Sequence, residues 1–294
     1  VYPAEFIAAS IADVTALRGL EDFGVDQLIG SVCDHGITCI NNQISRAYID
    51  VNRPVDALDN AMFTSPPSAA NTAAASSRHV RAGYGLLPRL TAAREVIHRQ
   101  LLPSDEVESR VALVHKPYHQ AVQAALTTAH SHFGRSLLID CHSMPSHDQH
   151  NKPLADFVLG DLHHSTLDPA IGVLLTKIIT EAGYSLAWNH PYAGGHITKN
   201  YGRAATRQFT RRSHLRIVAV NDVYELGNLP RLATLVAALQ AADLVEALSG
   251  DGTFTARRRR GARGTAARGT ARTALGRTSV PTWAKMPDLA TAYS

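Results

Sequence analysis

Residues 136–145, which read Ser-Leu-Leu-Ile-Asp-Cys-His-Ser-Met-Pro, constrain the fold of this chain more than any other stretch. Their apolar start predicts a strand that is buried on both faces of a parallel sheet and ends in polar side chains. The Met-Pro pair ends the regular structure. We expect Asp140 and His142 on the same side, because side chains along a strand repeat every two residues.

The position of Asp140 and His142 at the end of a strand makes them a candidate site. In open α/β sheets, ligands bind just beyond the carboxyl ends of the strands. A carboxylate and an imidazole there could act as a catalytic pair or as metal ligands. The alternative is that Asp140 caps the next turn and His142 is a satisfied surface histidine. Spacing alone does not separate these two interpretations.

Strands alternate with helices along the chain, which predicts an α/β sandwich around a mainly parallel sheet. Amphipathic spacing indicates the helices, and alternating or apolar runs indicate the strands. We expect helices within residues 3–28, 118–133, 169–182 and 229–248, and strands within 47–53, 136–143, 156–161, 184–189 and 215–220.

Charged residues outside the central stretch supply further candidates. Arg53 and Arg89 each follow the end of an element, where a guanidinium can bind a substrate carboxylate through two hydrogen bonds. Asp22 and Asp26 stand four residues apart, so on a helix they share one face, and one of them could reach a cation. The alternatives are ordinary surface arginines and a solvated acidic face.

The charge of the chain is divided between a body and a tail. With eight Arg and one Lys against two Asp, residues 251–294 carry a formal charge of +7, and the net charge of +4 leaves −3 for the first 250 residues. The tail has almost no large apolar residue between 255 and 278, so we expect it to be disordered. It could be a nucleic-acid arm, although the acidic body predicts no nucleic-acid partner. We therefore expect a folded domain over 1–250 and a basic tail over 251–294.

Composition and cysteine usage predict the cellular compartment of the protein. No run of about 18 apolar residues occurs, so no membrane span is expected. Residues 1–5 do not form the charged start of a signal peptide. The three cysteines, Cys33, Cys39 and Cys141, have no zinc-finger spacing and favour a reducing compartment. These features predict a cytoplasmic protein, whereas its oligomeric state does not follow from them.

Several short motifs occur together in one order. They are residues 45–53 (SRAYIDVNR), 82–89 (AGYGLLPR), 116–119 (KPYH), 138–145 (LIDCHSMP), 159–161 (LGD), 189–195 (NHPYAGG) and 201–203 (YGR). With this set, residues 2–248 resemble the N-formylglutamate amidohydrolase family, which is related to the zinc carboxypeptidase-like hydrolases. Each motif is weak alone, whereas the ordered set is specific.

The resemblance implies an α/β three-layer sandwich with a mainly parallel mixed sheet, and hydrolysis of an N-acyl (formyl) amino acid as in histidine degradation. In such chemistry zinc lowers the pKa of a water to about 7 and polarises the carbonyl, while a carboxylate transfers the proton. The residues that the resemblance assigns are His142 and Asp140 for catalysis, His142 with Asp22 or Asp26 for zinc, and Arg53, Arg89, Asn189, Tyr192 and Arg203 for the substrate.

Two features of the family differ in this chain. The family has a Pro-His-Ser-Gly segment, whose His resembles a metal ligand, just before the stretch that matches Tyr2, so we expect that strand upstream of Val1. The family also has a glutamate, the expected general base, at the position of Ala219. Loss of a general base costs about 10²–10⁴ in rate, which predicts a slow enzyme. The alternatives are a zinc deacylase or carboxypeptidase for another acyl-amino acid, an inactive homologue that binds acidic small molecules, and a nucleic-acid binder acting through the tail.

Overall fold

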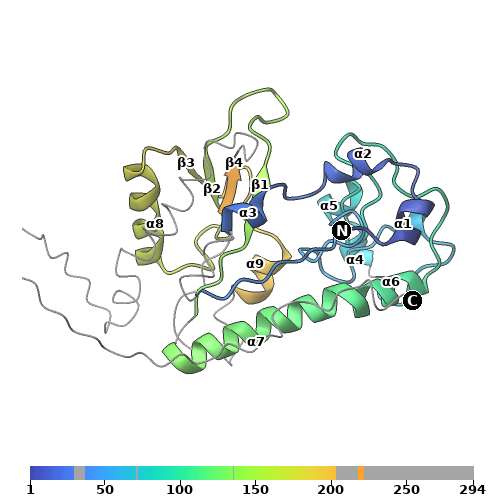
Figure 1. The fold of residues 1–294 in the computed structure, drawn as a ribbon, viewed down its shortest axis with the longest axis horizontal. Helices are drawn as coiled ribbons and strands as arrows, with labels where there is room; N and C mark the ends of the chain where they lie inside the picture. The colour runs from blue at the N-terminus through green and yellow to red at the C-terminus, as the bar shows by residue number, and fades with distance from the viewer. Residues whose placement is uncertain (30–36, 71, 135, 203–217, 222–294) are drawn as a thin grey trace, which may run out of the picture. The chain divides into compact units, whose positions relative to one another are not determined.

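The computed structural model describes residues 1–29, 37–70, 72–134, 136–202 and 218–221. Figure 1 labels its helices and strands. Arg203, Cys33, the helix expected over 229–248 and the basic tail over 251–294 lie outside the described residues.

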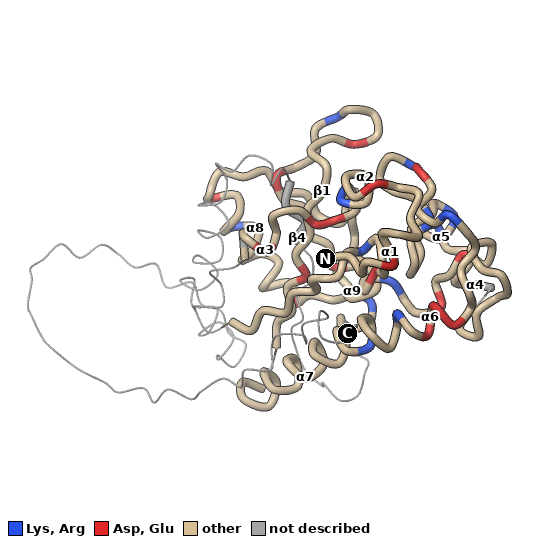
Figure 2. The backbone as a smooth tube through the Cα atoms, turned by 45° about the vertical axis from the view of Figure 1, so that its right-hand side comes forward, with Lys and Arg blue, Asp and Glu red and all other residues tan. Residues whose placement is uncertain are grey.

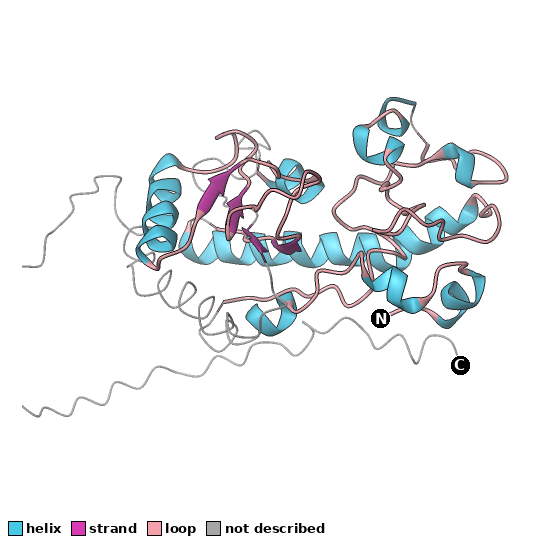
Figure 3. Ribbon diagram, turned by 90° about the horizontal axis from the view of Figure 1, so that it is seen from above, coloured by secondary structure: helices cyan, strands magenta, loops and turns pink. Residues whose placement is uncertain are grey.

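Short helices joined by loops come first along the chain, and the strands follow. The helical segments are α1 (Ala4–Ala9), α2 (Val14–Arg18), α3 (Val25–Ile29), the 3₁₀ turn η2 (Asn60–Met62), α4 (Thr72–Ala75), α5 (Arg78–Arg81), α6 (Asp105–Arg110), the π-helical turn η3 (Val111–His115), α7 (Lys116–Phe133), α8 (Pro169–Glu181) and α9 (His196–Tyr201). The strands are β1 (Cys141–Met144), β2 (Phe157–Leu159), β3 (Leu186–Trp188) and β4 (Val218–Asn221). Figure 3 shows how much of the chain between α3 and α6 is loop. Among the described residues, no helix has both the length and the apolar composition of a membrane span.

The described strands form one sheet in the order β1, β4, β2, β3 (Figure 1). β1 is parallel to β4 and β2 is parallel to β3, whereas β2 and β4 are antiparallel. α3 contacts β1 and α8 contacts β3. Helices packed on a small sheet with two parallel pairs are compatible with the predicted α/β class. The register pairs His142 of β1 with Ala219 of β4, so these two positions lie side by side.

The central strand begins later in the chain than the sequence predicts. The prediction starts it in the apolar run after Ser136 and ends it at Met144-Pro145, but residues 136–140 have no regular structure, and β1 begins at Cys141. The strand is defined by the pairing of Cys141–Met144 with β4 and not by the apolar run before it. His142 therefore lies within the strand, and Asp140 comes directly before it.

The segment 47–53 is not the strand that its alternating pattern predicts. Its residues form turns and loop, because a polar side chain bonds to the nearby backbone. The N–H of Asn52 donates to Asp50 Oδ1 at 2.9 Å, and the N–H of Arg53 donates to the Asp50 carbonyl at 3.1 Å. Local bonds of this kind compete with strand pairing. Asn52 is nevertheless buried, which brings a polar side chain into the interior.

Two helices confirm the predictions made from apolar spacing. α7 runs from Lys116 to Phe133 where the sequence predicts 118–133, and α8 runs from Pro169 to Glu181 where it predicts 169–182. Gly134 ends α7 with φ +66°, a backbone conformation that glycine adopts without strain. Lys116 is the one Lys, Arg, Asp or Glu of α7, so the helix is tan over nearly its whole length in Figure 2.

A buried cation joins α1 and α6 in the loop-rich part. Arg110 is 3% exposed and donates to Glu106 at 2.7 Å and to the Tyr48 carbonyl at 2.8 Å. Its guanidinium lies 5.5 Å from the ring centroid of Phe6 and 4.2 Å from that of Tyr48. His98 packs edge-on against Phe6, with the ring centroids 6.0 Å apart. The imidazole of His98 therefore lies in an apolar and electropositive environment.

The pH dependence of stability tests this environment. Burial, and then the charge of Arg110, lower the pKa of His98 to about 4, and its buried Nε2 has no hydrogen-bond partner among the described residues. The pKa in the unfolded chain is about 6.5, so acid protonates the unfolded state first. Relative to His98→Gln, the wild-type chain should lose about 3 kcal/mol of unfolding free energy as the pH falls from 6.5 to 4. Urea denaturation at a series of pH values measures this loss, and parallel pH profiles for the two proteins would contradict it.

Candidate active site

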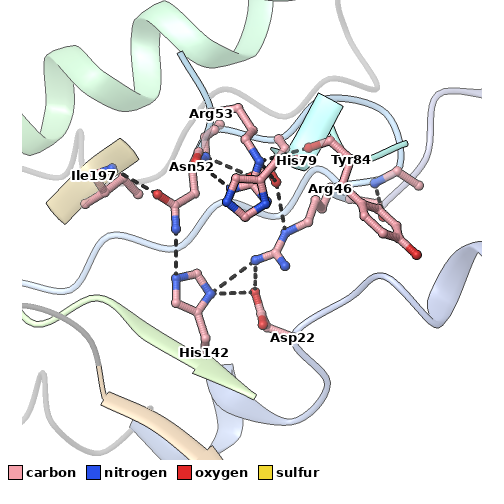
Figure 4. Close-up of polar contacts among 12 residues, drawn as sticks. Asp22, Arg46, Asn52, Arg53, His79, Tyr84, His142 and Ile197 are labelled. Atoms are coloured by element: carbon pink, nitrogen blue, oxygen red, sulfur yellow. Dashed lines mark hydrogen bonds and ion pairs between the residues drawn. The ribbon is translucent and has the colours of Figure 1, made fainter. Parts of the chain in front are cut away.

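His142 is at the centre of a polar cluster on β1 (Figure 4). Its Nδ1 lies 3.0 Å from Asp22 Oδ2, and its Nε2 lies 3.0 Å from Asp140 Oδ2. The side chain of His142 is 17% exposed, and Asp140 is buried. The two carboxylates thus face opposite nitrogens of one ring that remains partly open to solvent.

Asp22 lies before α3 and is held by donors from two other segments. Its Oδ1 accepts the N–H of Ser143 at 3.1 Å, and its Oδ2 accepts a hydrogen bond from Arg46 Nη2 at 2.7 Å. Asp26, by contrast, is exposed on α3, and its carboxylate makes no hydrogen bond or ion pair with the residues that the structure describes. The structure therefore brings Asp22, and not Asp26, to His142.

The two carboxylates determine the charge of the imidazole. Burial acts to lower the pKa of His142, but the charges of Asp140 and Asp22 outweigh burial and raise the pKa to about 10. Burial acts to raise the pKa of Asp22, but the charges of His142 and Arg46 hold it below its usual range. Without a metal, the ring and the Arg46 guanidinium are the groups that balance the charge of the two carboxylates.

A proton does not satisfy every polar atom around Nε2 of His142. Asn52 Nδ2 lies 3.3 Å from this nitrogen, and its direction is fixed because Asn52 Oδ1 accepts the N–H of Ile197 at 2.9 Å. An unprotonated Nε2 can accept the N–H of Asn52 but places its lone pair beside the Asp140 carboxylate. A protonated Nε2 can donate to Asp140 but faces the Asn52 amide donor. Asp140 Oδ2 is within ion-pair distance of the ring, yet it is buried and accepts no hydrogen bond from the described residues.

The donor atoms of this cluster fit a zinc ion, which binds imidazole nitrogen and carboxylate oxygen. Because Asp22 and Asp140 lie on opposite sides of the ring, a single ion can join His142 to only one of them. Burial, and then the charge of Asp140, raise the pKa of the neighbouring Cys141 thiol to about 12, which disfavours the thiolate that acts as a nucleophile.

The arginines predicted for substrate binding have partners within the chain. Arg53 donates through Nε to the Tyr84 carbonyl and through Nη1 to the Asn52 carbonyl, both at 2.9 Å (Figure 4). Arg89 Nε lies 3.1 Å from Asp59 Oδ2. The two carbonyls fix the guanidinium of Arg53 beside Asn52. Like Arg89, it also lies within ion-pair distance of an acidic side chain, because Arg53 Nε is 3.7 Å from Asp50 Oδ2.

The other predicted substrate residues, Asn189 and Tyr192, follow β3. Asn189 Oδ1 accepts the N–H groups of Asp161 at 3.0 Å and His163 at 3.1 Å, and Asn189 Nδ2 donates to Asp161 Oδ1 at 2.7 Å. Its amide therefore stabilises the loop after β2. Tyr192 is 41% exposed. Among the described residues, neither side chain is hydrogen-bonded to the His142 cluster.

Sequence reasoning missed two members of the cluster, Arg46 and Asn52. Both lie in the motif 45–53 that also contains Arg53, so membership of that motif was the available signal. Their roles depend on contacts with Asp22 and His142, which are far away in the sequence.

A second group of histidines could also hold a metal. His115 of η3, His119 of α7 and His196 of α9 each offer one ring nitrogen, and these atoms lie within 4.8 Å of one another. Part of this group was visible in the sequence, because His115 and His119 stand four apart and so share a helical face. His196 belongs to a distant motif, which no spacing rule connects to the other two.

The sequence was compared with known families and proteins. The model of the N-formylglutamate amidohydrolase family matches residues 1–214. This chain belongs to that family. The N-formylglutamate deformylases of Pseudomonas putida and Pseudomonas aeruginosa are each 32% identical to it, over 189 and 187 residues. These matches cover 63% and 62% of the chain and 64% of each relative, so the chain spans less than two thirds of their length.

One solved structure of the same family and one that shares the fold are similar to the chain. The crystal structure of N-formylglutamate amidohydrolase from Ralstonia eutropha JMP134 is 29% identical, has a TM-score of 0.70, and matches 84% of this chain and 90% of that one. The gene product Atu2144 of Agrobacterium tumefaciens, at 13% identity and a TM-score of 0.52 over 84% of this chain and 82% of that one, shares the fold alone. The resemblance inferred from the ordered motifs is therefore confirmed.

Asp22 and Asp26 provide a matched pair of substitutions. Asp22→Ala removes a charge beside His142 and an acceptor for the Ser143 N–H and for Arg46, so we expect the unfolding free energy to fall by about 2 kcal/mol. Asp26→Ala, on the exposed face of α3, should change it by less than about 0.5 kcal/mol. Urea denaturation with EDTA present measures both values without a contribution from bound metal. Equal stability of the two variants would contradict the contacts described for Asp22.

Proposed function

We propose that the chain is a zinc-dependent amidohydrolase of the N-formylglutamate deformylase type, which hydrolyses the formyl amide bond of N-formylglutamate to formate and glutamate. The observation that carries the proposal is the pairing of His142 with Asp22 in a chain of the N-formylglutamate amidohydrolase family. The relatives named as deformylases support the choice of substrate.

We assign zinc to His142 Nδ1 and Asp22, where it would replace the Arg46 guanidinium, whose Nη2 lies 3.1 Å from Nδ1 and 2.7 Å from Asp22 Oδ2. Asp140 then faces Nε2, the other ring nitrogen, at 3.0 Å. Histidines that bind metal almost always donate their second ring N–H to a carboxylate, a carbonyl or water, which fixes the tautomer and the orientation of the ring. Asp140 thus becomes a positioning residue in place of the catalytic role that the sequence suggests.

Bound zinc would supply an activated water with a pKa of about 7 and a polarised formyl carbonyl. The chain would bind and orient the substrate. Arg53 is the stronger candidate for a carboxylate of the glutamate moiety, because two backbone carbonyls already fix its guanidinium beside Asn52. Arg89 is the weaker candidate, since its acidic partner Asp59 lies closer, at 3.1 Å, than Asp50 does to Arg53 Nε, at 3.7 Å.

The remaining substrate residues are proposed from the family resemblance. We assign Arg203 to the second carboxylate of the substrate and Tyr192 to the wall of the pocket. For Asn189 we propose an indirect part, because both ends of its amide bond to residues of the 161–163 loop.

The site lacks the glutamate that the family resemblance implies as the general base. The family's glutamate corresponds to Ala219, and the sheet register pairs this position with His142. Because Ala replaces this glutamate, we expect the chain to hydrolyse N-formylglutamate about 10²–10⁴-fold more slowly than a site that has its general base.

Restoring the carboxylate tests both the function and the missing base. We expect Ala219→Glu to raise kcat for formate release from N-formylglutamate by at least about 100-fold, with KM nearly unchanged, because a general base acts in the transition state. Ala170→Glu, on the exposed start of α8, adds the same charge elsewhere and should leave the rate at the wild-type value.

Two outcomes of this assay would count against the proposal. An unchanged rate in Ala219→Glu would show that position 219 is not the place of the base. No formate from either protein in the presence of added zinc would show that the chain does not deformylate this substrate.

The residue Ala219 also favours a second candidate, a non-catalytic homologue that binds acidic small molecules. A binder keeps the fixed guanidinium of Arg53 and needs no base. It would bind N-formylglutamate in a calorimeter and release no formate, and Ala219→Glu would not change that result.

We also propose that the described sheet belongs to a three-layer sandwich of the zinc carboxypeptidase type. The similarity to the Ralstonia eutropha structure supports this, as do the contacts of α8 with β3 and of α3 with β1.

A further inference from the structure

Three histidines form a second cluster, separate from His142 and its carboxylates. The ring centroids of His115 and His119 lie 4.3 Å apart, those of His119 and His196 5.4 Å, and those of His115 and His196 6.1 Å. η3 and α7 carry the first two, and the third begins α9. Because η3 is a π-helical turn directly before α7, the pair at 115 and 119 stands at a local irregularity of the helix, a feature that is frequent at functional sites.

Backbone carbonyls fix the tautomers of two of these rings. His115 Nε2 lies 2.9 Å from the Arg53 carbonyl, and His119 Nε2 lies 2.9 Å from the Val51 carbonyl. A carbonyl accepts only, so each Nε2 must carry the proton and each Nδ1 must carry a lone pair. An imidazole anchored in this way by its second nitrogen has the usual geometry of a metal ligand.

The unprotonated Nδ1 atoms of His115 and His119 outnumber the described hydrogen-bond donors beside them. The Tyr201 hydroxyl lies 2.7 Å from His119 Nδ1, but it also lies 3.0 Å from the His119 carbonyl, which can accept its proton instead. Among the described residues, no donor reaches His115 Nδ1. A cation bound at Nδ1 of His115 and His119 would therefore displace only the Tyr201 hydroxyl, which can donate to the His119 carbonyl instead.

Burial lowers the pKa of each of the three rings, which favours the neutral form of imidazole that metals bind.

The cluster is open to solvent. It lines a cavity of about 860 Å³ together with Asn200, Tyr201 and residues of α7. An ion can reach the histidines from this side, and a fourth ligand such as water has room there.

We propose that His115, His119 and His196 bind one divalent transition-metal ion of the Zn²⁺ class at a site independent of His142. Three imidazole nitrogens suit zinc and its neighbours and are poor ligands for Mg²⁺ or Ca²⁺, which take oxygen. The ion ties η3, α7 and α9 to the 51–53 segment, whose Asn52 bonds to Ile197 and reaches His142. Its part is therefore to hold that segment in place.

Metal stoichiometry tests the site on the full-length chain, prepared without a histidine tag and stripped with EDTA. The titrants are Zn²⁺ in a calorimeter and Co²⁺ followed by visible absorption. The wild-type chain should bind two equivalents, His196→Gln and His142→Gln one each, and the double variant none. His132→Gln changes an exposed histidine of α7 and should still bind two.

The outcomes separate this site from the proposed zinc at His142. One equivalent that is lost in His196→Gln but kept in His142→Gln supports the histidine cluster and removes the zinc assigned to His142. Wild-type stoichiometry in His196→Gln, or the same loss in His132→Gln, overturns the cluster as a site. If circular dichroism shows that His196→Gln is unfolded, His115→Gln takes its place, with the same expected loss of one equivalent.

Discussion

Charge on both sides of one imidazole organises the polar interior of this protein. His142 stands between Asp22 and Asp140, at 3.0 Å from each. One buried carboxylate, Asp140, and one partly buried carboxylate, Asp22, would be costly without a cation, so the ring, or a metal bound to it, is needed to keep them there. Arg46 strengthens the arrangement by bonding to Asp22, and Asn52 limits the directions that remain open around Nε2.

The irregular segment around Asn52 connects this cluster to the histidines of α7 and α9. Its side chains and its carbonyls serve different neighbours: the Asn52 amide reaches His142, while the Val51 and Arg53 carbonyls accept from His119 and His115. A regular strand would have used those carbonyls in sheet pairing. The turns imposed by Asp50 therefore free the backbone to anchor imidazoles, and one short segment supports two possible cation sites.

The sequence predicted what depends on local pattern and missed what depends on distant contacts. Apolar spacing located α7 and α8 almost to the residue, because amphipathic faces and the proline and glycine at their ends act locally. Alternation failed at 47–53, where side-chain bonds from Asp50 replace strand pairing. The family motifs indicated His142, but no spacing distinguished Asp22 from Asp26 or joined His196 to α7. Those choices depend on how α3 and α9 pack, which the residues of either helix alone do not determine.

The choice of ring nitrogen is the central claim, since it makes Asp22 a zinc ligand and Asp140 the residue that orients the ring. Anomalous diffraction at the zinc edge, from crystals grown with zinc, tests it directly. The account predicts a peak about 2.1 Å from His142 Nδ1 and a similar distance from an Asp22 oxygen. A peak on Nε2 beside Asp140, or no peak at His142 when zinc is bound elsewhere in the same crystal, would contradict it.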